Sequence, residues 1–250
     1  MKPLIFKKSY SEKFAKQMLR AIKAYNMIEK NEKVAVALSG GKDSITLLYL
    51  LAWLKKYSYL EFELFAIHIN TFEKKEEYFY QDICDLLNVR LFSENLIRPD
   101  DLPNKSICSA CARLKRGAMR KICDKNNITA LAFGHHATDI AETLLMNMII
   151  NKKLGSFCPK VKISDSNVKV IRPMVYLTER NILGLHNYFE LPIANYKCPY
   201  EPKNIRKDFK NLLIQLLNSL PIVDGELNIV SSLENLDESN LYQRILENYL

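Results

Sequence analysis

Short apolar segments alternate with longer amphipathic ones along most of the chain. Five segments of four to eight residues are rich in β-branched and other apolar side chains and predict buried strands, at residues 34–38, 62–69, 89–92, 129–133 and 168–171. Segments with helical apolar spacing between them predict helices at residues 44–56, 75–88, 111–125 and 139–151. This alternation is typical of an α/β fold, in which a parallel sheet is covered by helices on both faces.

Helical patterns also flank this alternating region. Residues 11–30 have apolar side chains at helical spacing, and seven Lys or Arg residues lie between residues 2 and 23. We therefore expect a basic amphipathic helix before the sheet. Further helices are expected at residues 178–190 and 204–220, and one or two more in the acidic residues 233–246.

These patterns predict three parts and two loops. The parts are a basic helix in residues 1–30, the sheet domain in residues 31–200 and a helical extension in residues 201–250. Pro-containing segments at residues 97–103 and 157–161 predict loops at the rim of the sheet.

The first predicted strand is followed by a glycine loop, which comprises Ser39, Gly40, Gly41, Lys42, Asp43 and Ser44. Glycines allow a tight turn, and the N-terminus of the next helix directs backbone N–H groups at an anion. Lys42 adds a positive charge. Asp43 would repel a bare phosphate, so its presence indicates a Mg²⁺ ion between it and the phosphates. The loop lacks the longer spacer of a Walker motif, and it predicts an ATP site of another type.

Polar residues also follow the second and fourth predicted strands. Asn70 follows the second strand, and residues 134–139, which begin with Gly134 and His135 and end with Asp139, follow the fourth. Ligands of doubly wound sheets bind at the carboxyl ends of the strands, where the strand order reverses. We expect these residues to meet the glycine loop at one crevice. Asp139 can cap the next helix, ligate Mg²⁺ or phosphate, or do both.

The charge is unevenly distributed over the 250 residues, which carry a net charge of +8. Six acidic residues and one Arg after residue 222 sum to −5, so the first 222 residues carry +13. Such an excess indicates a polyanion such as nucleic acid, although a solvated Lys-rich surface gives the same balance. We expect a cytoplasmic protein and no membrane partner, because no apolar run spans a bilayer and no secretion signal is visible.

Three of the six cysteines show no sign of metal binding. Cys84 and Cys123 lie in helices with apolar periodicity and are expected in the core, and Cys158 has no partner in the sequence. Cys108 and Cys111 are different, because two intervening residues allow both thiolates to ligate one metal.

Cys198 is the natural third partner of this pair if its segment returns to the same rim. A C-x-x-C pair alone is compatible with a redox pair, half a zinc site or part of an iron–sulfur site. The helix after the pair carries basic residues that can bind a phosphate backbone or simply face solvent, namely Arg113, Lys115, Arg116, Arg120, Lys121 and Lys125.

Together these motifs resemble the TtcA family of tRNA 2-thiocytidine synthetases, which are PP-loop ATP pyrophosphatases. The resemblance rests on the order and spacing of the glycine loop, Cys108-x-x-Cys111, Arg-Leu-Lys-Arg-Gly at 113–117, residues 134–139 and Ile-Arg-Pro-Met at 171–174. It extends from about Ala21 through the helix at residues 208–217. The glycine loop identifies only the superfamily, whereas its combination with the cysteines and the basic helix is more specific.

The resemblance implies a Rossmann-like fold (adenine nucleotide α-hydrolase-like) with a five-stranded parallel sheet in the order 3-2-1-4-5. It implies that Cys108, Cys111 and Cys198 hold a [4Fe-4S] cluster and that Lys115 and Asp139 act in the reaction. ATP and Mg²⁺ would adenylate the C2 oxygen of cytidine 32 in the tRNA anticodon loop. Sulfur from a donor such as a cysteine desulfurase would then displace AMP. A homodimer is compatible with the family.

Three positions depart from the family's pattern. Asn70 replaces an Asp, Thr138 replaces the first member of an Asp pair, and Cys198 lies in Tyr-Lys-Cys-Pro, where relatives have two cysteines. Two other functions remain alternatives. One is a PP-loop ligase or amidase that acts on another base or a small molecule and holds structural zinc on the cysteines. The other is a nucleotide- or cluster-sensing protein without turnover.

Overall fold

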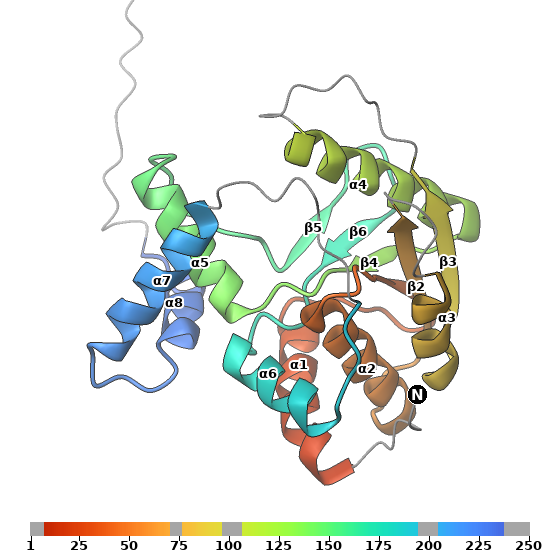
Figure 1. Ribbon diagram of the computed structural model, residues 1–250, viewed down its shortest axis with the longest axis horizontal. Coiled ribbons are helices and arrows are strands. Elements are labelled where there is room, and N and C mark those ends of the chain that lie inside the picture. Colours follow the sequence, from red (N-terminus) through yellow and green to blue (C-terminus); the bar gives the residue numbers. More distant parts are fainter. Residues whose placement is uncertain (1–7, 71–76, 97–106, 195–204, 238–250) are drawn as a thin grey trace, which may run out of the picture.

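The computed structural model describes residues 8–70, 77–96, 107–194 and 205–237. These residues form a six-stranded sheet in the order β3-β2-β1-β4-β6-β5, which is parallel except for the edge strand β5 (Figure 1). The strands are β1 (Glu32–Ala37), β2 (Phe62–Asn70), β3 (Arg90–Asn95), β4 (Ala130–Ala132), β5 (Lys160–Lys162) and β6 (Lys169–Ile171).

Helices cover both faces of the sheet, and a further helical group lies at its side. In the described residues the helices are α1 (Lys8–Ala24), α2 (Lys42–Tyr57), α3 (Glu77–Leu86), α4 (Ile107–Asn126), α5 (Ala137–Ile149), α6 (Glu179–Tyr188), α7 (Ile205–Asn218) and α8 (Gly225–Glu234). α4 lies on one face, whereas α1, α2 and α6 lie on the other (Figure 1). α7 and α8 both pack against α5, beside the sheet (Figure 1).

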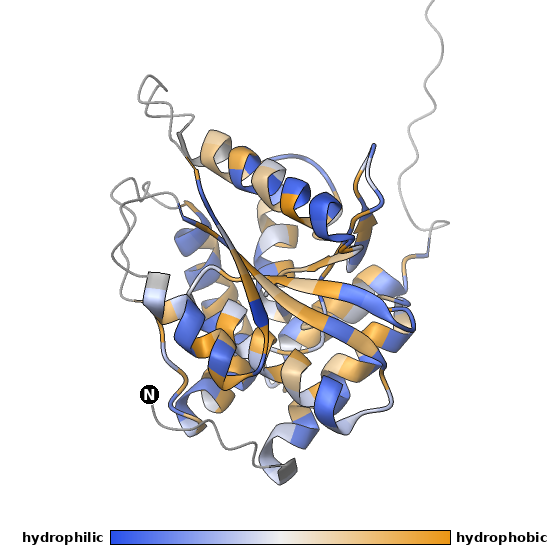
Figure 2. Cartoon of the chain, turned by 90° about the vertical axis from the view of Figure 1, so that its right-hand side faces the viewer, coloured by the Kyte–Doolittle hydropathy of each residue, from blue (hydrophilic) through white to orange (hydrophobic). Residues whose placement is uncertain are grey.

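The alternation of side chains along β1 explains the two layers of core. Val34 and Val36 are buried in the cluster that includes α1, α2 and α6, and Ala35 between them is buried in the α4 cluster. Successive residues of a strand point to opposite faces, so a strand that is apolar throughout must be covered twice. Figure 2 shows apolar stretches of the strands between α4 above and helices of the opposite face below.

The predicted strand order is confirmed for the five predicted strands, the fifth of which is β6. A rim loop is predicted at residues 157–161, and the prediction is wrong for its last two residues. There β5 begins at Lys160 and pairs antiparallel with β6. This strand is only three residues long and joins β6 through a short turn, in which Asp165 has a positive φ of 56°. A segment of this length is too short to show the alternation of apolar and polar residues that predicts a strand.

The helical extension contains α7, where a helix is predicted, and α8, which the sequence pattern does not predict. Its last described helix, α8, ends at Glu234 and lies before most of the predicted segment at residues 233–246, of which residues 238–246 fall outside the described residues. The loop predicted at residues 97–103 also falls outside them. No helix in the described ranges is both long enough and apolar enough to cross a membrane.

Candidate active site

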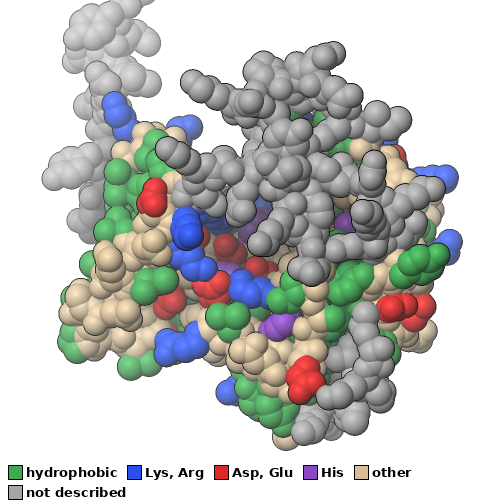
Figure 3. Space-filling model, viewed as in Figure 1, with side chains coloured by type: hydrophobic (Ala, Val, Ile, Leu, Met, Phe, Trp, Pro, Cys, Tyr) green, Lys and Arg blue, Asp and Glu red, His purple; other side chains and the backbone are tan. Residues whose placement is uncertain are grey.

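The carboxyl ends of β1, β2 and β4 meet at one cavity of about 320 Å³. Its lining includes predicted site residues from three separate parts of the sequence, namely Ser39, Asp43, Gly134, His135, Asp139 and, from α4, Lys115. The predicted crevice is therefore present. β2 contributes His68 and its neighbours to the described lining, whereas Asn70 is not part of it. Figure 3 shows acidic, basic and histidine side chains gathered in the middle of this face.

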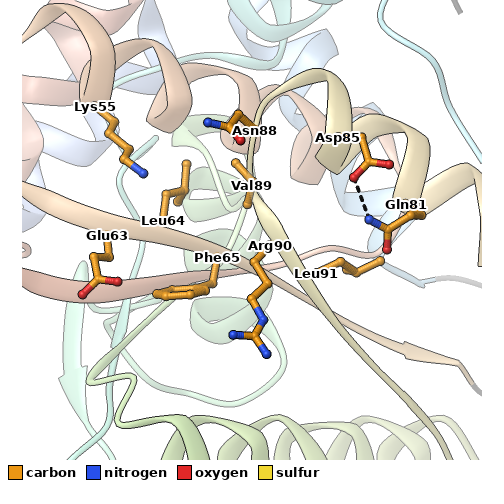
Figure 4. A pocket seen from close by; sticks show the side chains of 10 residues that line it. All are labelled: Lys55, Glu63, Leu64, Phe65, Gln81, Asp85, Asn88, Val89, Arg90 and Leu91. Carbon is orange, nitrogen blue, oxygen red and sulfur yellow. Dashed lines mark hydrogen bonds between the residues drawn. The ribbon is translucent and has the colours of Figure 1, made fainter.

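A second hollow of about 560 Å³ lies at the opposite, amino ends of β2 and β3 (Figure 4). Its lining side chains surround an open space, and on α3 Gln81 donates a hydrogen bond to Asp85. The glycine loop is at the other end of the sheet, where ligands of parallel sheets bind. The smaller cavity is therefore the candidate active site.

Gly40 gives the loop its shape. Its φ is +84°, and a Cβ atom there would lie 2.6 Å from the Cβ of Ala194. The Ala194 N–H donates to the Gly40 carbonyl at 2.9 Å, so the segment before residue 195 packs directly on the loop. Gly41 is the N-cap of α2, and as a glycine it has no side chain that could accept a hydrogen bond from the first N–H groups of the helix. The helix N-terminus thus lies beside the cavity without a side chain as its cap, as an anion site requires.

The two loop serines bind each other and the loop backbone. The Ser39 hydroxyl donates to Ser44 Oγ at 3.0 Å, and the Ser44 hydroxyl donates to the Gly41 carbonyl at 3.0 Å. The Ser39 N–H also donates to Ser44 Oγ, at 3.2 Å. Ser44 therefore holds the turn in its folded shape.

Lys42 lies between two carboxylates. Its Nζ is 2.9 Å from Asp43 Oδ1 and 3.0 Å from Oε1 of Glu179, the first residue of α6. Lys210 of α7 binds the other oxygen of Glu179 at 2.5 Å. Burial opposes the charged amine, but the two carboxylates outweigh it and raise the pKa of Lys42 above its ordinary value. Lys42 is therefore a cation in the neutral pH range.

Asp139 takes part in the cap of α5 and also lines the cavity, so the predicted cap is present, and its role as a ligand of Mg²⁺ or phosphate stays a prediction. The His136 backbone N–H donates to Asp139 Oδ2 at 3.1 Å, and the Asp139 N–H donates to His136 Nδ1 at 3.4 Å, which forms a capping box. Burial lowers the pKa of His136, so its ring is neutral and carries its proton on Nε2. That nitrogen lies 3.4 Å from Asp139 and 3.7 Å from Asp43.

His135 is held as a neutral ring on the cavity wall. Arg172 donates from Nε to His135 Nδ1 at 3.2 Å, and Phe157 stacks on the ring with centroids 4.5 Å apart. A guanidinium can only donate, so the proton of the neutral imidazole lies on Nε2. Burial lowers the pKa of His135 to about 4.

Cys111 and Lys115 lie on neighbouring turns of α4, where residues four apart share a face. Cys111 is half-buried, and Lys115 lines the cavity. Cys108 is one turn earlier on the same helix, but its side chain is not described, and Cys198 lies outside the described residues. No group of three metal-ligating side chains occurs among the side chains that the structure does describe.

The expected core positions of Cys84 and Cys123 are confirmed. Cys84 and Cys123 are buried, and burial raises the pKa of each thiol to about 12, which makes both unreactive. Cys158 is exposed.

Three charged residues of the site were missed by the sequence analysis. Glu179 begins α6, and Arg206 and Lys210 lie one turn apart on α7. Arg206 donates from Nη2 to Asp139 Oδ1 at 3.0 Å. No local motif connects these residues to the glycine loop, because helix packing brings them there. The hydroxyl of Thr138 accepts a hydrogen bond from the Glu179 N–H at 3.0 Å, which joins α5 to the start of α6.

The chain matches the PP-loop domain family over residues 10–206. It is 34% identical over 233 residues to a tRNA-cytidine(32) 2-sulfurtransferase of Geotalea uraniireducens, which covers 90% of this chain and 92% of that protein. The corresponding protein of Pseudomonas putida is 33% identical over 236 residues, 90% of this chain and 84% of its own.

A solved structure has the same fold. The U34-tRNA thiolase NcsA of Methanococcus maripaludis, solved with its [4Fe-4S] cluster, superimposes with a TM-score of 0.75 at 23% identity, over 95% of this chain and 84% of that chain. The chain therefore belongs to the PP-loop family and, within it, to the family of the tRNA-cytidine(32) 2-sulfurtransferases.

Proposed function

We propose that this protein is an ATP-dependent sulfurtransferase that thiolates C2 of cytidine 32 in tRNA. The observation that carries this proposal is the cavity, in which the glycine loop, Asp139 and Lys115 lie together one helical turn from Cys111. The names of the relatives, at 33% and 34% identity over 90% of the chain, support the same substrate.

The glycine loop is the proposed site of the activation step, in which ATP adenylates the cytidine. The N-terminus of α2 and Lys42 would bind the β- and γ-phosphates. Asp43 and Asp139 would hold a Mg²⁺ ion, which when bound would offset the charge that develops on departing pyrophosphate. The C2 oxygen of cytidine attacks the α-phosphorus, and pyrophosphate leaves. Sulfide then adds at C2, and the original oxygen leaves with AMP. Gly134 and His135 of the cavity lining are proposed to contact the nucleotide, and so is Asn70, which ends β2 but does not line the cavity.

The three cysteines are proposed to hold the cluster through three thiolates. Cys108 and Cys111 lie on one helix beside the cavity, and Cys198 would supply the third thiolate. When bound, such a cluster would supply an iron without a protein ligand, which could hold the transferred sulfur. Lys115 lines the cavity one turn after Cys111. It would orient the activated base and stabilise negative charge on the incoming sulfur.

The outer face of α4 is the proposed contact with tRNA phosphates. Arg113, Arg116 and Lys121 are exposed there, whereas Met119 and Ile122 on the opposite face are buried against the sheet. We propose that the enzyme acts in the cytoplasm with a sulfur donor such as a cysteine desulfurase, and as a homodimer. No observation favours the ligase or amidase alternative.

The test uses protein purified without oxygen, Mg²⁺-ATP, sulfide and an unmodified tRNA transcript. Formation of AMP that requires the tRNA, together with about four iron and four sulfide per chain, supports the proposal. Cys158→Ser is the matched control for Cys198→Ser, because only the second change removes a proposed ligand. AMP formation without tRNA, or tightly bound zinc without sulfide, would contradict the proposed function.

A further inference from the structure

We infer that Glu179 is a positioning residue that holds the ammonium group of Lys42 beside the glycine loop, and that Lys210 holds Glu179 in turn. This inference rests on the proposed function, since it concerns the same ATP site. It adds a role for α6 and α7, to which no part of the reaction has been assigned.

The geometry is a chain of ion pairs that crosses three helices. Lys42 begins α2, Glu179 begins α6 and Lys210 lies on α7, with separations of 3.0 Å and 2.5 Å between the paired atoms. The side chains of Lys42 and Glu179 are only 24% and 18% exposed. Ion pairs at this depth are screened less by water than surface pairs.

Glu179 is itself firmly placed. Its backbone N–H donates to the hydroxyl of Thr138, and Thr178 caps the helix that it begins. Burial alone would raise the pKa of Glu179, but Lys210 and Lys42 hold it below its ordinary value. The carboxylate is therefore charged and fixed before ATP arrives.

A fixed carboxylate has a clear use here, because lysine is a long side chain with several rotatable bonds and much conformational freedom to lose. Ordering it in advance makes its charge available to the transition state without reorganisation. A carboxylate beside an ATP site would also repel phosphate, and Lys210 offsets that charge. The pair Glu179–Lys210 thus positions Lys42 without adding net charge to the site.

The test is Glu179→Gln, which keeps the shape of the side chain and removes its charge. We expect kcat for tRNA-dependent AMP formation to fall at least tenfold, with KM for ATP unchanged or lower. Lys210→Met should give a smaller loss of kcat, about threefold. The double variant Glu179→Gln/Lys210→Met should be no slower than Glu179→Gln, because both changes act on the same series of ion pairs. Lys207→Met, on the exposed side of α7, is the matched control and should leave kcat unchanged.

A second measurement does not depend on turnover. Amine acylation of ATP-free protein, followed by mass spectrometry, should label Lys42 several times faster in Glu179→Gln than in the wild type or Lys207→Met. Unchanged labelling would overturn the inference. So would a normal kcat with a lower KM, which would make Glu179 a competitor of ATP, or a raised Mg²⁺ requirement, which would make it a metal ligand. If the wild type forms no AMP with tRNA, the proposed function fails, and the labelling still decides the role of Glu179.

Discussion

Arg206 of α7 joins two carboxylates of α5, with its Nη2 3.0 Å from Asp139 Oδ1 and its Nε 3.4 Å from Glu142 Oε2. Glu142 is only 4% exposed, and burial together with the charge of Asp139 raises its pKa. Two neighbouring carboxylates therefore share one cation that comes from a distant part of the chain.

Arg206→Met should destabilise the fold, because it leaves the buried carboxylate of Glu142 without its cation. Breaking a fully buried pair costs about 3–5 kcal/mol. The side chain of Arg206 is 38% exposed, so we expect about 1–2 kcal/mol in urea unfolding. Adding Glu142→Gln should restore most of this loss, and a double variant as unstable as the single one would contradict the shared-cation account.

Gly117→Ala should separate stability from tRNA binding. Gly117 lies inside α4 among the exposed Arg113, Arg116 and Lys121, and a Cβ atom there would meet no described atom within 4 Å. Alanine should stabilise the helix by up to about 1 kcal/mol. The added methyl group lies on the proposed tRNA-binding face, so the same change should weaken tRNA binding several-fold.

Gly184→Ala in α6 is the control, because a Cβ atom there would make only an ordinary contact with Tyr10 Oη at 3.7 Å. It should stabilise the protein without changing the Kd for tRNA. Equal Kd values for Gly117→Ala and Gly184→Ala, in a filter-binding assay at fixed salt, would show that tRNA does not contact the helix at Gly117.

Gly40→Ala should damage the ATP site, because alanine is strained at a φ of +84° and its Cβ would lie 2.6 Å from that of Ala194. We expect a loss of about 1–3 kcal/mol of stability and at least tenfold weaker binding of Mg²⁺-ATP by calorimetry. Gly41→Ala is the control for the loss of stability, because φ there is −76° and its Cβ would make only an ordinary contact, with Ser39 Oγ at 3.6 Å. An equal loss of stability in both variants would contradict this account.

His135 should make the protein less stable in acid. Its pKa is about 4 in the folded protein and 6.5 ordinarily, so the unfolded chain binds the proton more tightly. Stability is therefore lost as the pH falls from about 6.5 toward 4. Between pH 7 and pH 5, the wild type should lose about 2 kcal/mol more than His135→Asn in urea unfolding. Parallel losses in the two proteins would show that the ring is not buried as a neutral group.

The sequence predicts the parts of the site that are local and misses those that packing creates. The glycine loop, Gly134, His135 and Asp139 follow strands whose apolar pattern is clear, and the topology rule brings their carboxyl ends together. Glu179, Arg206 and Lys210 lie in amphipathic helices where a charged residue normally faces solvent, so only the packing of α6 and α7 reveals their contacts. The three-residue β5 was missed because it is too short to carry a pattern.

The central claim is tested most directly by mapping thiolated nucleosides in tRNA. Protein purified without oxygen is incubated with Mg²⁺-ATP, sulfide and a transcript that carries cytidine at position 32, and the nuclease fragments are analysed by mass spectrometry. The account predicts 2-thiocytidine at position 32, one AMP for each sulfur gained, and no product with Cys111→Ser or with uridine at position 32. AMP formation with no thiolated base, or thiolation of another position, would contradict it.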